Sequence, residues 1–386
     1  MEPTAPDVVV IGAGAVGATV ALELSRAGKR VLVLDAGEGP GAGCSYANAG
    51  LLSPSHVQPM TTPANVREGL TNLLDPSGPF RLTPRPTLLP WLLSFARHST
   101  PRRTRALTER LQAMARRSLA LHLAYPREGI ETSCVQTGAV DVIGDRRVVH
   151  EEDATCNTLT YVRAVLDAAT AKGASVRWGA RVEGLRRRDP GSAAGVGAGV
   201  DVLLDGRWIS PEHVVVAAGM GSPALLAELG LRLPMQGATG YVIDLERNDA
   251  APDRPTTFVD HRVVVTPFAD RVRLAGTLDL GARTGQVQPH RVDAIRAAGR
   301  RAYPDLAWER EIEVWRGDRP TTSDGVPVIG ESARVPGLVV ATGHGMWGLV
   351  LAPITAEWVR RGLVEGDVTL TDPTFSPDRF TRRRAA

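Results

Sequence analysis

The stretch DVVVIGAGAVG, residues 7–17, constrains the fold of this chain more than any other part of the sequence. A short apolar strand runs directly into Gly12, Gly14 and Gly17, a helical pattern follows, and a second apolar strand ends at Asp35. In a β-α-β unit of this kind the glycines make the turn, let backbone approach a pyrophosphate and allow close helix packing. The helix N-terminus then offers N–H groups to phosphate, and the acid accepts hydrogen bonds from ribose hydroxyls. The pattern predicts a dinucleotide-binding site.

The glycine pattern does not distinguish NAD from FAD, but the rest of the chain lacks the regular β-α repeats of a typical NAD dehydrogenase. It enters the small-residue loop GAGCSYANAGLL at 41–52 and then a proline-rich, loop-like region from about 55 to 105, with short amphipathic pieces such as LLPWLLSFARH. Alternating residues at 236–280 predict antiparallel strands. Buried strands that end in glycine turns return near 213 and 337. This discontinuous layout favours an FAD-binding domain with an added second domain.

Length and composition narrow the class of protein. The chain has 386 residues, 43% of them hydrophobic, which suggests a large core and two or three domains. The net charge of +3 comes without a basic patch that alternates with aromatic residues, so nucleic-acid binding has little support. Because Cys44, Cys134 and Cys156 are far apart and in no metal-ligand spacing, we expect no disulfide, no metal site and a cytoplasmic location.

Residues 104–124 form a strong helix candidate with many arginines. Two interpretations of its charge stay open. The favoured one is a solvated basic face on a helix that packs on the core. The other is peripheral contact with anionic lipid at the inner face of a membrane. The residues concerned are Arg102, Arg103, Arg105, Arg110, Arg116 and Arg117.

Five stretches together are more specific than the first glycines. They are VVVIGAGAVGATVALELSRAGKRVLVLD, CSYANAGLLSPS, VVVAAGMGSP, WRGDRPTTSDGVPVIG and LVVATGHGMWGLVLAP. In them the chain resembles the amino-acid-oxidising flavoproteins of the D-amino-acid oxidase and glycine oxidase type, most of all bacterial D-amino-acid dehydrogenase. The resemblance implies an α/β fold with a discontinuous Rossmann-like FAD-binding domain and an α+β substrate-binding domain with an antiparallel sheet. The expected boundaries are 1–57, 150–235 and 320–386 for the first domain, and 58–149 and 236–319 for the second.

The resemblance also implies which residues bind FAD. The S-x-x-N-A-G loop would lie along the flavin N5 and O4 edge, where small residues let main-chain N–H groups approach the ring. The TGHGMWG turn at 342–348 would contact the pyrimidine end, with a helix N-terminus behind it. The expected cofactor-binding residues are Gly12, Gly14, Ala15, Val16, Gly17, Asp35, Ala36, Ser45, Asn48, Ala49, Gly50, Leu51, Val182, Ala218, Gly219, Gly343, His344, Gly345, Met346 and Gly348. Because no cysteine follows Cys156, the covalent attachment of monomeric sarcosine oxidases is excluded and we expect FAD to be non-covalent.

For the substrate, the resemblance places Arg319 of WRGDRP at the arginine that holds the carboxylate of an amino acid. A guanidinium can bind a carboxylate through two parallel hydrogen bonds. Asp318 departs from the family pattern, in which an uncharged residue is usual, and either pairs with an arginine or points away. Tyr241 and His261 could line the pocket, although core or surface roles are the simpler interpretation of each. His344 either takes part in the reaction or only caps its turn.

The expected reaction is oxidation of the C–N bond of a D-amino acid, or of a related secondary or cyclic amine, to an imine by hydride transfer to flavin N5. Electrons would pass to oxygen or to a quinone or other carrier. One alternative is a glycine- or sarcosine-type oxidase that uses oxygen. Another is a tailoring oxidase for a bulky or carrier-bound amine, because GDRRVVHEED replaces a helical segment of a few dozen residues that longer family members carry before the stretch at 150–165.

Overall fold

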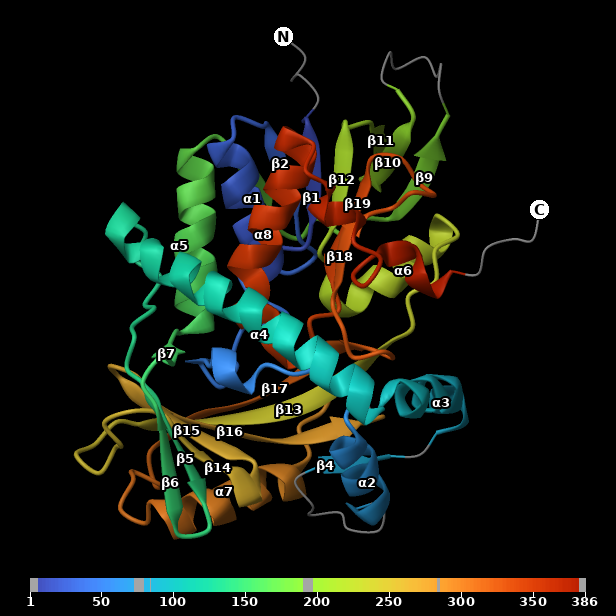
Figure 1. The fold of residues 1–386 in the computed structure, drawn as a ribbon. Coiled ribbons are helices and arrows are strands. Elements are labelled where there is room, and N and C mark those ends of the chain that lie inside the picture. The colour runs from blue at the N-terminus through green and yellow to red at the C-terminus, as the bar shows by residue number, and fades with distance from the viewer. Residues whose placement is uncertain (1–5, 73–79, 84, 190–196, 283–284, 382–386) are drawn as a thin grey trace.

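The computed structural model describes residues 6–72, 80–83, 85–189, 197–282 and 285–381. They form two units, one around a largely parallel sheet and the other around a largely antiparallel sheet (Figure 1). In the chosen view the parallel sheet lies above the antiparallel one, and a long helix, α4, crosses in front of the boundary. The expected fold class is therefore confirmed.

The first unit is built on a six-stranded sheet in the order β18-β19-β12-β1-β2-β8. Neighbouring strands are parallel except β18 and β19, which are antiparallel. Its central strands are short, apolar and buried on both faces, as parallel strands covered by other layers usually are. The strands are β1 (Val8–Ile11), β2 (Val31–Leu34), β8 (Ser175–Arg177), β12 (His213–Val216), β18 (Val328–Glu331) and β19 (Leu338–Thr342).

Helices α1 (Ala15–Arg26), α5 (Thr158–Ala171) and α8 (Gly348–Glu365) share one hydrophobic core with strands of this sheet. A second core lies between the sheet, helix α6 (Ser222–Glu228) and a three-stranded antiparallel sheet. That small sheet contains β9 (Gly184–Arg188), β10 (Gly199–Leu204) and β11 (Arg207–Ile209). Both cores are assembled from segments far apart in sequence, as the discontinuous layout predicted.

Helix α4 (Pro101–Ala124) belongs to the core of the first unit, although the expected boundaries assign it to the substrate-binding domain. The side-chain oxygen of Thr100 accepts a hydrogen bond from the backbone of Arg103 and caps the helix, which begins three residues before the expected start. The Ser118 hydroxyl of α4 accepts a hydrogen bond from the Ile354 backbone N–H of α8 at 3.2 Å, which links the two helices. The apolar face of α4 predicted that this side of the helix is buried, but it did not predict that the helix packs on the first unit.

The second unit is an eight-stranded sheet in the order β17-β13-β16-β15-β14-β5-β6, with β4 paired to β16. Most pairs are antiparallel, while β14–β5 and β16–β4 are parallel. Helix α7 (Pro289–Ala302) packs on one face through a core of its own. The strands are β4 (Phe80–Leu82), β5 (Ala139–Ile143), β6 (Arg146–His150), β13 (Met235–Glu246), β14 (Thr256–Phe258), β15 (Val263–Pro267), β16 (Arg271–Leu280) and β17 (Glu311–Thr322).

Shorter elements connect the two units. A two-stranded ladder joins β3 (Leu51–Leu52) to β7 (Ala154–Thr155). The proline-rich region expected to be loop-like contains two helices, α2 (Pro63–Thr71) and α3 (Leu89–His98), the first capped by Thr62. Each begins with proline at a first-turn position, where the missing N–H is harmless.

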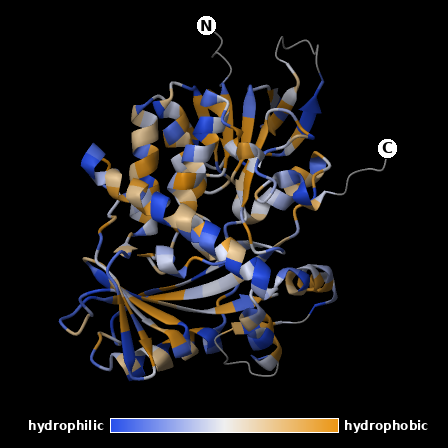
Figure 2. Cartoon of the chain, in the orientation of Figure 1, coloured by the Kyte–Doolittle hydropathy of each residue, from blue (hydrophilic) through white to orange (hydrophobic). Residues whose placement is uncertain are grey.

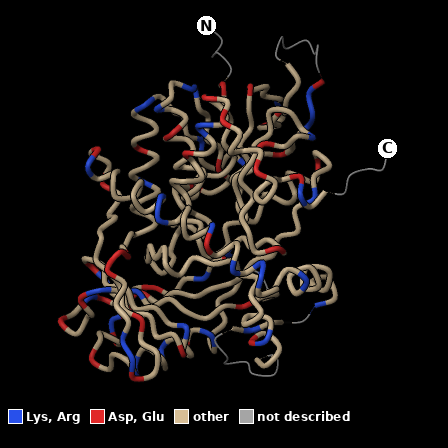
Figure 3. The backbone as a smooth tube through the Cα atoms, viewed as in Figure 1, with Lys and Arg blue, Asp and Glu red and all other residues tan. Residues whose placement is uncertain are grey.

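Hydrophobic residues follow the strands and the helix faces between layers, whereas charges of both signs are interspersed over the outside (Figures 2 and 3). Several arginines of α4 are in ion pairs, with Asp324, Asp372, Glu152 and Glu357 as partners of Arg103, Arg110, Arg116 and Arg117. This arrangement supports the interpretation of α4 as a core-packed helix with a solvated basic face. Within the described ranges, no helix combines the length and apolar character needed to cross a bilayer.

Candidate active site

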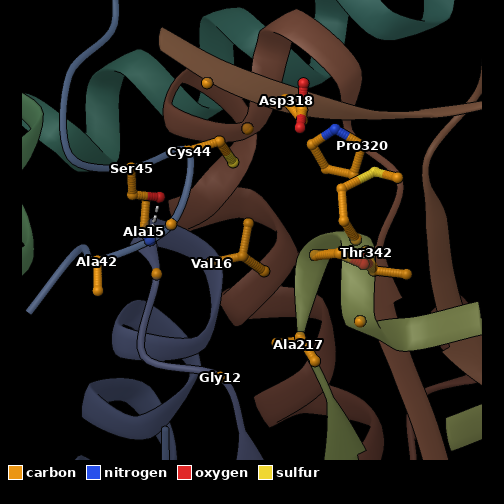
Figure 4. A pocket seen from close by; sticks show the side chains of 18 of the residues that line it. Gly12, Ala15, Val16, Ala42, Cys44, Ser45, Ala217, Asp318, Pro320 and Thr342 are labelled. Atoms are coloured by element: carbon orange, nitrogen blue, oxygen red, sulfur yellow. Dashed lines mark hydrogen bonds between the residues drawn. The ribbon is translucent and has the colours of Figure 1, made fainter. Parts of the chain in front are cut away.

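A cavity of about 750 Å³ lies where the carboxyl ends of β1, β2, β12 and β19 meet strands β13 and β17 of the second sheet. Figure 4 shows Gly12 towards the bottom of this view, Ala15 beside Ser45 with Cys44 above them, Val16 near the middle, and Asp318 and Pro320 at the top. Ligands of open α/β sheets bind in this position, outside the carboxyl ends of the strands. The cavity brings together the two glycine-rich turns that the sequence predicted to form one site.

Most of the expected site residues line this cavity, and several do not. Those that line it are Gly12, Gly14, Ala15, Val16, Asp35, Ala36, Ser45, Asn48, Val182, Ala218, Gly219, Arg319, His344, Gly345, Met346 and Gly348. Those outside the lining are Gly17, Ala49, Gly50, Leu51, Tyr241 and Gly343.

The first glycine turn is closely packed. Gly12 has φ 107°, and a Cβ there would lie 2.5 Å from the Ala217 carbonyl oxygen. Gly17 supports the cavity without lining it, since a Cβ on Gly17 would lie 1.9 Å from the Gly12 carbonyl oxygen. Gly14 is the N-cap of α1 and leaves the helix N-terminus open towards the cavity. Such an N-terminus is a favourable site for phosphate.

Asp35 and Ser45 hold the backbone around this turn. The Asp35 carboxylate accepts hydrogen bonds from the backbone N–H groups of Ala13, at 2.6 Å, and Gly37, at 2.8 Å. The Ser45 hydroxyl accepts from the Ala15 N–H at 3.1 Å, the dashed line in Figure 4. The expected flavin loop is therefore attached to the start of α1, and the acid predicted to bind ribose stands at the edge of the same cavity.

The second half of the loop turns away from the cavity. The Asn48 side-chain oxygen accepts from the Gly50 N–H at 2.8 Å, and the Ala49 carbonyl accepts from the Thr266 hydroxyl at 2.6 Å. Leu51 begins strand β3. These contacts place residues 49–51 against the second unit, so their expected contact with flavin finds no support in the cavity lining.

The second glycine turn delivers η7 (Gly345–Trp347) and the N-terminus of α8 to the cavity. His344 lies in this turn and is buried, and its Nε2 is 3.0 Å from the Thr355 hydroxyl of α8. Burial lowers the pKa of His344 to about 3, so its imidazole is neutral at physiological pH. The contact with Thr355 favours a role in fixing the turn over a role in proton transfer.

Arg319 lies in the cavity on β17 with its guanidinium over the backbone of Gly240, where a Cβ would come within 2.0 Å of Nη1. Nη1 is buried and has no hydrogen-bond partner among the described residues. Burial lowers the pKa of Arg319, while the nearby Cys44 and Asp318 oppose that shift. Because arginine stays protonated in proteins, the site holds a desolvated cation with a free N–H group.

Asp318 does not neutralise Arg319 by an ion pair. Its Oδ1 pairs with Arg316 Nη2 at 2.5 Å and also accepts from the Thr239 hydroxyl. The unusual acid of the WRGDRP motif is therefore paired with an arginine, one of the two arrangements expected, and the partner is Arg316. The carboxylate clamp expected of Arg319 is not blocked.

Tyr241 was a candidate for the substrate pocket, with a core role as the simpler interpretation, and the structure places it in the core on the other face of β13. Its strand neighbours Gly240 and Val242 line the cavity, and side chains alternate between the faces of a strand. Tyr241 is fully buried in the core under α7, where burial raises the pKa of its hydroxyl to about 12. His261 is exposed in the connection between β14 and β15 and is not part of the lining.

Sequence reasoning missed several lining residues, among them Cys44, Ala47, Val242, Trp315 and Arg316. Trp315 and Arg316 belong to a motif that had been recognised, so the signal was present. Cys44 directly precedes Ser45 and begins the CSYANAGLLSPS stretch, so a signal for its position was present there as well. Burial raises the pKa of its thiol, which makes it a poor nucleophile towards a bound cofactor.

A family model described as DAO, FAD dependent oxidoreductase, matches residues 7–361. The chain belongs to this family. It is therefore an FAD-dependent oxidoreductase, and FAD is its cofactor. The observed cavity fits FAD. The closely packed turn at Gly12 and the N-terminus of α1 suit its phosphates, and the Asp35 carboxylate suits its ribose. The N-terminus of α8 faces the same cavity.

Comparisons with individual proteins agree with membership of the DAO family. The chain is 30% identical over 395 residues to the D-amino acid dehydrogenase of Paramagnetospirillum magneticum, covering 89% of this chain and 92% of that protein. Its fold is similar to that of glycine oxidase from Geobacillus kaustophilus, with a TM-score of 0.69, 21% identity and coverage of 98% and 99%. It is also similar to L-proline dehydrogenase from P. horikoshii, with a TM-score of 0.70, 16% identity and coverage of 98% of each chain.

Proposed function

We propose that this protein oxidises the C–N bond of an amino acid, a D-amino acid or a related secondary or cyclic amine, to the imine. Membership of an amino acid and amine oxidoreductase family sets the class of reaction. The similarity to a D-amino acid dehydrogenase supports the D-configured substrate. The observation that carries the proposal is the buried, unpartnered Nη1 of Arg319 inside the cavity.

Arg319 would bind the carboxylate of the substrate. A charge-assisted hydrogen bond of this kind contributes about 1.5–3 kcal/mol, and a desolvated site strengthens the attraction. Gly240 leaves room for the guanidinium, and β17 and β13 hold it on a rigid sheet. The bound carboxylate would fix the orientation of the substrate carbon that loses hydride.

Other groups of the cavity would shape the substrate side. The Arg316–Asp318 pair is nearly neutral as a unit and lies on the same strand as Arg319. Cys44, Ala47 and Val242 add small or apolar surface that excludes water. When bound, FAD would supply the acceptor for the hydride. The neutral His344 would hold the second glycine turn in place through Thr355.

A substrate panel tests the proposal. Purified FAD-loaded protein is assayed with D- and L-amino acids, glycine, N-methyl amino acids and proline analogues, with oxygen or a quinone as electron acceptor, and the oxo acid or cyclic imine is identified. We expect turnover of a D-amino acid or a secondary cyclic amine that carries a carboxylate. Best turnover of an amine without a carboxylate, or no turnover of any amine, would contradict the proposal.

A further inference from the structure

Three ionisable side chains converge outside the FAD cavity, where the segment after β3 meets the β5–β6 hairpin. His56 ends the short helix η1 (Pro54–His56), Asp141 lies on β5 and His150 ends β6. One atom of each, His56 Nε2, Asp141 Oδ2 and His150 Nε2, lies within 4.8 Å of the other two. The two imidazole nitrogens are 2.7 and 3.1 Å from the shared carboxylate oxygen.

The other ring nitrogen of His56 sets its tautomer. The Ser53 hydroxyl contacts both His56 Nδ1 and the Asp153 carboxylate. A carboxylate only accepts, so Ser53 gives its one hydrogen to Asp153 and accepts from the N–H of His56 Nδ1. With Nδ1 turned towards Ser53, His56 Nε2 faces Asp141 Oδ2 at 2.7 Å and is the nitrogen placed to bind an ion.

One oxygen of each carboxylate in this cluster lacks a donor. Asp141 Oδ1 and Asp153 Oδ1 are both buried and have no hydrogen-bond partner among the residues described. Asp153 is fully buried. Buried carboxylate oxygens are normally paired with a donor or a positive charge, and the cluster contains no lysine or arginine ion pair to Asp141 or Asp153 in the described part of the chain.

We propose that His56, Asp141 and His150 bind a divalent transition-metal ion of the zinc type. Two imidazoles and a carboxylate are a typical donor set for such an ion. The two N···O separations of 2.7 and 3.1 Å suit metal–ligand bonds of about 2 Å, and the two imidazole nitrogens, which lie within 4.8 Å of each other, would close on the ion by side-chain rotation. The Ser53–Asp153 contact orients His56 as second partners commonly orient metal-binding histidines. The His56 side chain is 32% exposed, so the cluster can be reached from solvent.

Such an ion would tie the two units together. Ser53 and His56 directly follow the loop that borders the FAD cavity, while Asp141 and His150 belong to the eight-stranded sheet. Binding at this junction would stabilise the folded state, because the ligands are brought together only by folding.

The experiment uses full-length, FAD-loaded protein without a histidine tag, stripped with a chelator that is then removed. Zinc chloride is titrated by calorimetry, and the melting temperature is measured with and without zinc. We expect saturation at one ion per chain and a higher melting temperature. His150→Gln and Asp141→Asn should each weaken zinc binding at least about tenfold while the flavin absorbance stays unchanged, and the exposed His261→Gln should bind zinc as the unaltered chain does.

Two results would overturn the proposal. One is zinc binding that His150→Gln and Asp141→Asn leave unchanged, because the ion would then be adventitious. The other is an unaltered chain without saturable binding, which would make the cluster a hydrogen-bond network. Two variants on separate strands are used because His56→Gln alone could disturb the loop beside the cavity. The measurement does not depend on amine turnover, so its outcome is separate from that of the proposed function.

Discussion

The guanidinium of Arg319 occupies space that exists because residue 240 has no side chain. A Cβ on Gly240 would lie 2.0 Å from Nη1 and 2.4 Å from Nη2, far inside van der Waals contact. The colliding atoms are at the end of a flexible side chain, so a small residue here would displace Arg319 and leave the strand intact. The position of the Arg319 guanidinium therefore depends on Gly240, which has no side chain of its own to contact a substrate.

Gly240→Ala should therefore weaken substrate binding without unfolding the protein. We expect KM for a carboxylate substrate to rise by about tenfold, because the displaced guanidinium would lose roughly one charge-assisted hydrogen bond to the carboxylate. Steady-state kinetics together with circular dichroism measure this. Gly39→Ala is the control, because a Cβ there meets nothing within 4 Å. An unchanged KM for Gly240→Ala would mean that Arg319 does not act from the observed position.

At the scale of elements, one buried carboxylate connects the turn after β17 to the C-terminal segment. Asp324 pairs with Arg379 of η9 (Pro377–Phe380) through two contacts of 2.9 and 3.1 Å, and lies 3.6 Å from Arg103 of α4. Burial alone would raise the pKa of Asp324, but the arginines outweigh it and the pKa is lowered. The ionised carboxylate therefore stabilises the folded state.

Asp324→Asn should lower the free energy of unfolding by about 3 kcal/mol, because it leaves Arg379 buried without its counter-charge. Since the folded pKa is depressed, this stabilisation is fully present above the unfolded pKa of about 3.9 and is lost as pH falls through the folded pKa. Denaturant unfolding at neutral pH and below pH 4 checks both statements. Asp205→Asn, on the exposed pair with Arg177, should change stability by less than about 0.5 kcal/mol. Equal effects of the two substitutions would contradict the assignment.

Elements with local signals could be predicted from the sequence, and contacts between distant segments could not. The turn at Gly12, the strand that carries Arg319 and the closing helix α8 have apolar periodicity or glycine patterns within a few residues. The sequence left the choice between pocket and core open for Tyr241, because the phase of a strand decides which face a side chain occupies and both faces of β13 are buried. The cluster around His56 was missed because its ligands come from three separate segments.

At the scale of the whole molecule, the FAD cavity is shared by both units. Its lining includes the glycine turns of the first sheet and the strands β13 and β17 of the second. FAD bound in this cavity would contact residues of both units. Binding energy from such a cofactor adds to the stability of the folded chain, by about 2.7 kcal/mol at a concentration one hundred times Kd.

The FAD should be held without a covalent bond. We expect acid denaturation and centrifugation to leave the flavin absorbance in the supernatant, because the thiol of Cys44 is disfavoured as a nucleophile by burial and Cys134 and Cys156 lie in the core away from the cavity lining. The protein prepared without FAD should also melt at a lower temperature. Flavin that stays with the precipitate would show a covalent link, with Cys44→Ala as the variant that identifies it.

The measurement that tests the central claim most directly is anaerobic bleaching of the bound flavin by matched substrates. The FAD-loaded protein is mixed with a D-amino acid and, separately, with the amine that lacks only its carboxylate. We predict fast bleaching by the D-amino acid alone. For Arg319→Ala, the concentration of D-amino acid that gives half of the maximal bleaching rate should rise by about 10- to 100-fold. Equal bleaching by both compounds, or an Arg319→Ala protein that distinguishes them as well as the unaltered chain does, would contradict the account.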